Sequence, residues 1–194
     1  MSAITLKFGG STLHGPESIK RVSRLIALKS KQARSFVVVS ALKGSTEALI
    51  AISRSTATEA LAQFDALIER HRLTARALLD GARVLAWETD IAPYCATCRH
   101  VLAADTRRDG DIATLLAVGE KLSAALLHQV LQLDLQDSRW LCSEHLIITK
   151  GRRLQATVDL HASRSALQAL LENPEPNRIT IITGFCGGDG KGRT

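Results

Sequence analysis

Short apolar runs alternate with longer stretches of helical periodicity along this 194-residue chain. Ile4, Leu6 and Phe8 occupy every second position near the start, which predicts a strand. Residues 36–39 are continuously apolar and mostly β-branched, a pattern typical of a strand covered on both faces in a parallel sheet. The run RITIIT, residues 178–183, predicts another apolar strand that leads into glycines.

Helical patterns occupy most of the remaining chain. Ile19, Val22 and Ile26 recur at helical spacing after a proline and an acid that suit a first helical turn. Residues 44–133 are rich in Ala, Leu, Glu and Arg and predict a helical insertion with a break near residues 90–93.

A second region of strand character follows the helical insertion. The segments RWLCSEHLIIT and LQATVDL are expected to form a smaller β excursion. A short helix is expected from about Ser163 to Leu171, and the NPEPN segment at residues 173–177 is expected to end it.

Strands separated by helices predict an α/β fold, a three-layer αβα sandwich with a mainly parallel sheet. Three of the strands run into glycine or small polar residues, in KFGGST, VVVSALKGST and IITGFCGG. Ligands of open parallel sheets bind outside the carboxyl ends of the strands. We therefore expect these three strand ends to converge on one crevice.

The first of these ends, KFGGSTL, has the composition of an anion-binding loop. Lys7 supplies a positive charge, Gly9 and Gly10 leave backbone N–H groups accessible, and Ser11 adds a hydroxyl. The alternative is an ordinary strand-to-helix turn whose lysine points into water. Convergence of the three strand ends favours phosphate binding.

Glu120 stands out on the helix DIATLLAVGEKLSAALLHQVLQL. The core stripe of that helix is formed by Leu115, Val118, Leu122, Leu126 and Val130. Glu120 lies on a second apolar face with no basic residue at helical spacing, and Lys121 points elsewhere. A buried, unpaired carboxylate is costly, so Glu120 either reaches water at the helix margin or meets a cation from elsewhere, such as a ligand ammonium.

Amino-acid composition and charge reduce the number of protein classes to which this chain could belong. The chain is 45% hydrophobic, has a net charge of +6 and contains only 4% aromatic residues, which favours a soluble globular protein with anionic partners over a nucleic-acid module. The pattern also predicts no secretion signal and no membrane span, hence a cytoplasmic location. Cys95 and Cys98 resemble a redox or metal motif, but the companion residues are not evident, so we interpret them as packing residues.

Four segments, KFGGST, VVVSALKGSTEAL, LLAVGEKLSAALL and TGFCGGDGKGRT, occur in this order. They resemble the KFGG motif, the SA-x-x-G-x-T segment, the GE-[RK]-x-SA helix and the TGF-x-G…GRT segment of the aspartokinases, in the amino-acid kinase superfamily. The resemblance covers essentially the whole chain. Ser11 and Thr12 are swapped relative to the usual Thr-Ser order, which keeps both hydroxyls.

The resemblance implies that Lys7 contacts the transferring phosphoryl group and that Gly9, Gly10 and Ser11 contribute to the phosphate loop. The aspartate side of the site would contain Ser40, Thr46, Glu120, Gly184 and Phe185. Glu120 would face the substrate amino group, and no metal ligand is assigned to the protein. The implied reaction transfers the ATP γ-phosphoryl group to L-aspartate, with Mg²⁺ held mainly by the phosphates.

The resemblance also implies a domain organisation. Residues 1–194 correspond to the amino-terminal, substrate-binding part of the kinase domain. An LGRGGSD-type loop, the nucleotide-binding half and ACT regulatory domains would follow Thr194, so this chain alone is expected to have little activity. The complete enzyme is expected to be a homo-oligomer. The alternatives are another amino-acid kinase, acting on acetylglutamate or glutamate, and a non-catalytic binding or oligomerisation module.

Overall fold

A computed structural model describes residues 3–134, 137–172 and 178–194. Its main sheet has the strand order β1-β2-β6-β3. The strands are β1 (Ala3–Phe8), β2 (Arg34–Val39), β6 (Ile179–Thr183) and β3 (Ser138–Leu141). All three neighbouring pairs are parallel, which confirms the predicted sheet.

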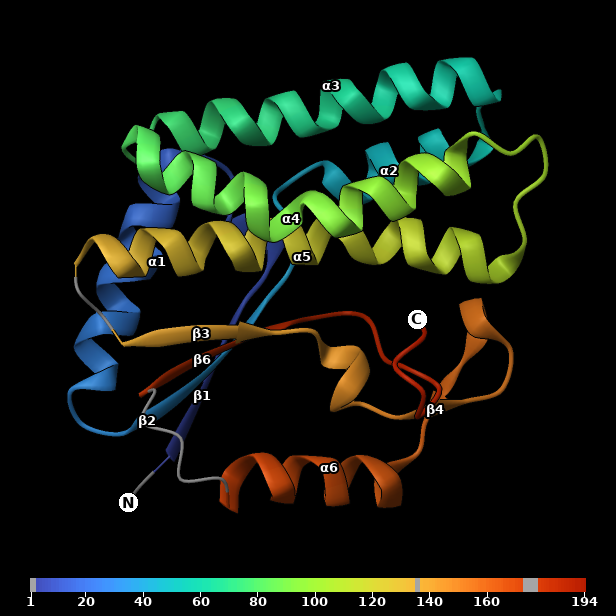
Figure 1. Ribbon diagram of the computed structural model, residues 1–194. Coiled ribbons are helices and arrows are strands. Elements are labelled where there is room, and N and C mark those ends of the chain that lie inside the picture. The colour runs from blue at the N-terminus through green and yellow to red at the C-terminus, as the bar shows by residue number, and fades with distance from the viewer. Residues whose placement is uncertain (1–2, 135–136, 173–177) are drawn as a thin grey trace.

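Helices cover both faces of the sheet and form the predicted three layers (Figure 1). On one face lie α1 (Pro16–Ser30) and α5 (Asp109–Leu133), and on the other lies α6 (Leu160–Glu172). The helical insertion consists of α2 (Ser45–Arg54), α3 (Ala57–Arg76), α4 (Gly81–Leu102) and α5. Helices α2 and α4 pack against α5 on the side away from the sheet, and α3 packs against α2 and α4.

Burial explains why the strand and helix patterns were so clear. Val37 and Val39 of β2 belong to the large core under α1 and α5, whereas Phe36 belongs to a smaller core under α6. Because α5 lies between the sheet and α4, it is buried on most sides. All five residues of its predicted core stripe are buried.

The predicted helix break near Pro93 is wrong, because α4 continues through this residue. A proline removes one backbone hydrogen bond and crowds the preceding turn, at a cost of about 3 kcal/mol. Burial of Trp87, Ile91, Cys95 and Cys98 along one face of α4 offsets that cost and holds the helix in place. The two cysteines are therefore packing residues, and burial raises the pKa of their thiols to about 11 and about 12.

The predicted smaller β sheet is present, but it uses only the end of its first predicted segment together with the second segment. Residues 138–141 join the main sheet as β3, with Trp140 and Leu141 in register with Ile181 and Ile182 of β6. The small antiparallel sheet is formed by β4 (Thr149–Lys150) and β5 (Thr157–Val158). Single turns of 3-10 helix occur at η1 (Gly10–Thr12), η2 (Ser143–His145) and η3 (Arg153–Gln155).

Helix α6 begins three residues earlier than predicted. The Asp159 carboxylate accepts hydrogen bonds from the backbone N–H groups of His161 and Ala162, both at 3.1 Å, and so satisfies the first turn. The segment expected to end this helix, residues 173–177, lies outside the described residues. Among the helices that are described, none combines the length and the apolar character that a bilayer crossing requires.

Candidate active site

The carboxyl ends of three strands meet at one edge of the sheet, as predicted. Phe8, Val39 and Thr183 are in register across β1, β2 and β6. Backbone hydrogen bonds connect the loops that follow: Ser40 N–H donates to the Phe8 carbonyl at 3.0 Å, and Gly184 N–H donates to the Val39 carbonyl at 2.7 Å. Three loops are therefore fixed side by side at this edge.

The loop after β1 is the glycine turn that the sequence suggested. Thr12 closes it, because its backbone N–H and its hydroxyl both donate to the Gly9 carbonyl, at 2.9 and 2.6 Å. A Cβ at Gly10 would lie 3.3 Å from the Ala41 carbonyl oxygen, whereas a Cβ at Gly9 would meet open space. Close packing against the neighbouring loop therefore explains why residue 10 is a glycine, but it does not explain the glycine at position 9. Ser11, the next residue in the turn, is exposed.

Lys7 is exposed at the end of β1, next to this turn. Side chains alternate along a strand, and Phe8 faces the core under α1 and α5. Lys7 therefore lies on the α6-facing side of the sheet, whereas Glu120 approaches the same edge from α5. The two residues share the edge but come from opposite layers.

The loop after β2 is bound directly to α5. The Ala41 N–H donates to Glu120 Oε1 at 3.2 Å, and the Ser123 hydroxyl donates to the Ser40 carbonyl at 2.6 Å. A Cβ at Gly119 would lie 2.8 Å from Ala41 Cβ, so a glycine is needed where the helix meets the loop. Gly119 and Ser123 were not singled out from the sequence, although both lie within the GEKLSA motif.

Glu120 is buried, with only 3% of its surface exposed, so the exposed-margin alternative does not hold. Within the described ranges, no lysine or arginine lies at ion-pair distance from its carboxylate. Burial raises the pKa of Glu120 to about 7, the Ala41 N–H lowers it, and the Glu144 carboxylate adds a smaller increase. A cationic group brought next to Glu120 would stabilise its charged form.

Thr46 lies in the first turn of α2, after a turn that α3 holds in place. Gly44 has φ +80°, a conformation that favours glycine, and it precedes the buried Ser45. Arg70 Nη2 donates to the Ser45 hydroxyl at 2.8 Å, and His71 Nε2 lies 3.5 Å from the same oxygen. Sequence reasoning missed this contact because α3 carries no local signal for it.

Replacing Ser45 with alanine is expected to lower the free energy of unfolding by about 1–2 kcal/mol, because the buried His71 and the exposed Arg70 lose their common hydroxyl. Urea denaturation of the 194-residue chain measures this change. Ser53→Ala is the matched control, since among the described residues that hydroxyl donates to the Ile50 carbonyl of its own helix and joins no other element. Equal losses in the two variants would contradict a role for Ser45 in holding the turn.

The loop after β6 contributes Gly184 and Phe185. A Cβ at Gly184 would lie 2.9 Å from the Val39 carbonyl oxygen, so the neighbouring strand requires glycine here. Phe185 has φ +65° and is 77% exposed. An exposed aromatic residue in the left-handed region is strained, and such strain is concentrated at ligand sites.

Two cavities adjoin this loop. One, of about 480 Å³, is lined by Leu116 and Ala117 of α5 and by Phe185 and Cys186. Because Leu116 and Ala117 precede Glu120 by one helical turn, this cavity lies along the same face of α5, and its size suits a small molecule. The other, of about 550 Å³, lies between the sheet and α6 and also reaches Gly184 and Phe185.

The structure thus brings together some, but not all, of the residues predicted to form the site. Ser40, Glu120 and Gly184 are joined through the hydrogen bonds of neighbouring loops. Phe185 borders the cavity that continues along the Glu120 face of α5. Lys7 lies on the other side of the strand ends, so its role in the site stays a prediction.

A model of the Amino acid kinase family matches residues 3–194, nearly the whole chain. The chain belongs to the amino acid kinase family. Its fold agrees with that assignment: the structure of Escherichia coli aspartokinase III in complex with aspartate and ADP superimposes with a TM-score of 0.86 at 20% identity. That comparison covers 100% of this chain and 42% of the aspartokinase III chain.

Sequence relatives of this amino acid kinase are aspartokinases. It is 31% identical over 193 residues to an aspartokinase of Chlamydia muridarum, a match that covers 98% of this chain and 41% of the relative. It is 29% identical over 187 residues to the chloroplastic bifunctional aspartokinase/homoserine dehydrogenase 2 of Arabidopsis thaliana, covering 92% of this chain and 20% of the relative. The chain thus spans about two fifths of the length of the monofunctional aspartokinases it matches.

Proposed function

We propose that this chain forms the aspartate-binding part of an aspartokinase, which transfers the γ-phosphoryl group of ATP to the side-chain carboxylate of L-aspartate. The product would be 4-phospho-L-aspartate. Aspartokinase relatives of about 30% identity support the choice of substrate. The observation that carries the proposal is Glu120, a buried carboxylate near the strand ends that has no lysine or arginine at ion-pair distance among the described residues. The ammonium group of aspartate would supply the missing charge.

The proposed chemistry requires positioning more than acid–base catalysis. The carboxylate of aspartate is already a nucleophile, so no general base is needed. Lys7, beside the glycine turn, would neutralise charge on the transferring phosphoryl group. Mg²⁺ would arrive with the nucleotide: the described residues contain no group of three His, Cys, Asp or Glu side chains suited to a metal, so the phosphates are its expected ligands.

The part of the site contributed by this chain would be the aspartate side, formed by Ser40, Thr46, Glu120, Gly184 and Phe185. We assign the phosphate loop to Lys7, Gly9, Gly10 and Ser11. The nucleotide-binding half and regulatory ACT domains would lie in residues outside this chain, which fits the two-fifths coverage of its relatives. The complete enzyme would be a cytoplasmic homo-oligomer.

Calorimetric titration with L-aspartate tests the proposal at pH 8, where Glu120 is ionised. L-Aspartate is expected to bind, and N-acetyl-L-aspartate, which lacks the ammonium group, is expected to bind at least about tenfold more weakly. Binding of N-acetyl-L-glutamate in preference to L-aspartate would instead support the alternative amino-acid kinase. Coupled ATP turnover with aspartate should be detected when residues beyond Thr194 are included, and its absence there would overturn the proposed reaction.

A further inference from the structure

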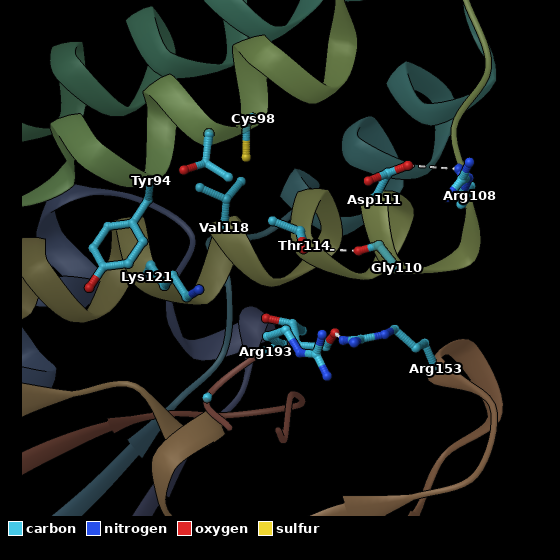
Figure 2. A pocket seen from close by; sticks show the side chains of 13 residues that line it. Tyr94, Cys98, Arg108, Gly110, Asp111, Thr114, Val118, Lys121, Arg153 and Arg193 are labelled. Carbon is cyan, nitrogen blue, oxygen red and sulfur yellow. Dashed lines mark hydrogen bonds between the residues drawn. The ribbon is translucent and has the colours of Figure 1, made fainter. Parts of the chain in front are cut away.

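A third cavity, of about 590 Å³, lies along another face of α5 (Figure 2). Its α5 wall is formed by Thr114, Val118 and Lys121, whereas the predicted aspartate site uses the face that contains Leu116 and Glu120. Helix α4 contributes Tyr94 to this cavity. The cavity therefore uses a different face of α5 from the proposed substrate site, although Arg153, Arg193 and Thr194 line both cavities.

Basic side chains are concentrated around this cavity. Arg108, Lys121, Arg153 and Arg193 line it, and Asp111 is the acidic residue among its lining groups. In Figure 2, Lys121 and Arg108 lie at opposite ends of the α5 wall, and Arg153 and Arg193 face that wall from the other side. An anion inside the cavity would meet positive charge from several directions.

The carboxylates near these groups do not balance them. Arg153 and Arg193 share one carboxylate, that of Asp189, at 3.4 and 2.7 Å. For Arg108, no carboxylate in the described part of the chain lies within ion-pair distance of the guanidinium. Asp111 instead accepts the Arg108 backbone N–H at 2.9 Å. Together with Glu144, three side-chain carboxylates face four side-chain cations, and the Thr194 main-chain oxygen accepts a further hydrogen bond from Arg153.

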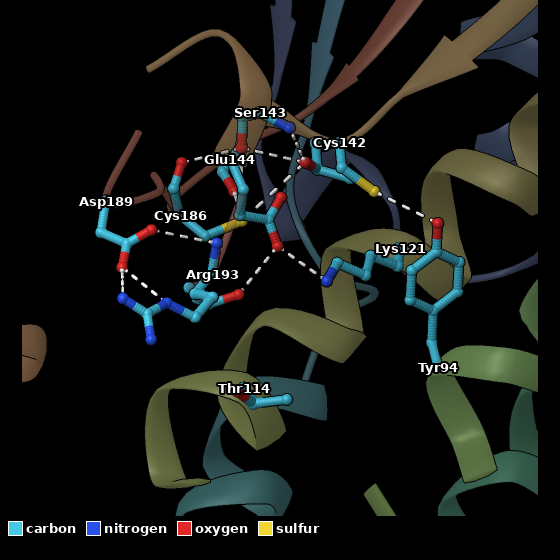
Figure 3. A network of polar contacts seen from close by, with 12 residues as sticks. Tyr94, Thr114, Lys121, Cys142, Ser143, Glu144, Cys186, Asp189 and Arg193 are labelled. Atoms are coloured by element: carbon cyan, nitrogen blue, oxygen red, sulfur yellow. Dashed lines mark hydrogen bonds and ion pairs between the residues drawn. The ribbon is translucent and has the colours of Figure 1, made fainter. Parts of the chain in front are cut away.

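Lys121 is held by a network of polar contacts beside the cavity (Figure 3). Its ammonium lies 2.7 Å from Glu144 Oε1 and 4.8 Å from the centre of the Tyr94 ring. The same Glu144 oxygen accepts the Thr194 hydroxyl at 3.0 Å. Because Lys121 and Glu144 are both buried, this charge is fixed in position, whereas Arg108 and Arg193 are exposed at the mouth.

We infer that this cavity binds the oxyanion group, phosphate or carboxylate, of a small ligand. Arg108 and Arg193 donate to the oxyanion, because a guanidinium matches the geometry of two carboxylate or phosphate oxygens. Lys121 contributes a fixed charge behind them, and the N-terminus of the 25-residue helix α5 adds to the positive potential. Val118, Cys98 and the Tyr94 ring give the body of the ligand an apolar wall.

Calorimetric titration of the 194-residue chain with inorganic phosphate and, separately, with succinate tests this inference. Saturable binding of phosphate or of succinate is expected, and the preferred probe identifies the oxyanion. Arg108→Gln and Arg193→Gln should each weaken that binding by about tenfold, because each removes a charge-assisted contact. Absence of saturable binding with both probes would overturn the inference.

Control variants distinguish binding in this cavity from binding to other positively charged parts of the surface. Arg164→Gln removes an exposed arginine of α6 that does not line the cavity, and it should leave binding unchanged. Lys7→Gln removes the cation of the proposed phosphate loop. Loss of binding in this variant, with Arg108→Gln unaffected, would place the bound phosphate at the glycine turn and overturn the inference. Arg108 is exposed, and its guanidinium has no carboxylate at ion-pair distance among the described residues, so its variant should fold normally, which thermal unfolding verifies. This test is independent of aspartate phosphorylation.

Discussion

Replacing Lys7 with alanine is expected to lower kcat by at least about a hundredfold in an active aspartokinase that contains residues 1–194, which corresponds to about 3 kcal/mol of transition-state stabilisation. The proposed reaction depends on neutralising charge on the phosphoryl group as it is transferred. Lys7 is an exposed cation at the end of β1, beside the glycine turn. Coupled measurement of ADP release at saturating aspartate and ATP gives the relevant kcat.

An exposed lysine elsewhere provides the control for this experiment. Lys29→Ala, in the last turn of α1, should leave kcat within about twofold of the parent protein. Lys7→Ala should not change the thermal unfolding midpoint, because the Lys7 side chain is exposed. Near-normal turnover in the Lys7 variant would remove this residue from the reaction and leave the glycine turn as an ordinary connection.

The main features of the fold could be predicted because periodicity reports burial directly. The alternation of Ile4, Leu6 and Phe8 and the stripe on α5 both follow from one face of an element meeting the core. The strand at residues 138–141 was assigned to the wrong sheet, because β3 is short and its partner β6 lies about 40 residues further along the chain. The break predicted near Pro93 was wrong because tertiary packing of α4 outweighs the tendency of proline to end a helix.

The candidate site was predictable to the same extent. The lack of a basic partner for Glu120 could be inferred from its own helix, because the residues three and four positions away are the ones that could pair with it there. The contacts of Ser45 with Arg70 and His71 join separate helices, and no local pattern specifies them. The charge cluster at Arg108, Lys121, Arg153 and Arg193 was missed for the same reason: its members are brought together only by the packing of α5 against the later loops.

Replacing Glu120 with glutamine is expected to stabilise the fold at pH 8 while weakening aspartate binding. Burial raises the pKa of Glu120 from 4.5 to about 7, so the folded state binds a proton more tightly than the unfolded state. Stability contributed by this group is therefore lost as pH rises from about 4.5 to 7, and above pH 7 the ionised side chain costs up to about 3 kcal/mol. Glutamine carries no charge and can still accept the Ala41 N–H.

Urea denaturation at pH 8 and near pH 4.5 checks the stability effect. The gain of Glu120→Gln over the parent chain should be largest at pH 8 and should be nearly lost near pH 4.5, where Glu120 is protonated in the folded parent and half protonated in the unfolded parent. Glu17→Gln is the matched control, because this glutamate is exposed and pairs with Lys20, so the variant should show no such gain. A Glu120 variant that is less stable than the parent at pH 8 would contradict the argument.

The same substitution should weaken L-aspartate binding by at least about tenfold, since the ammonium group loses its charged partner. The two effects have one cause: a carboxylate that is buried without a cation destabilises the empty protein and gains its partner only when ligand binds. Such a residue lowers stability and raises affinity, a trade-off common at binding sites. If aspartate bound the glutamine variant as tightly as the parent, the isolation of Glu120 would need an explanation other than substrate recognition.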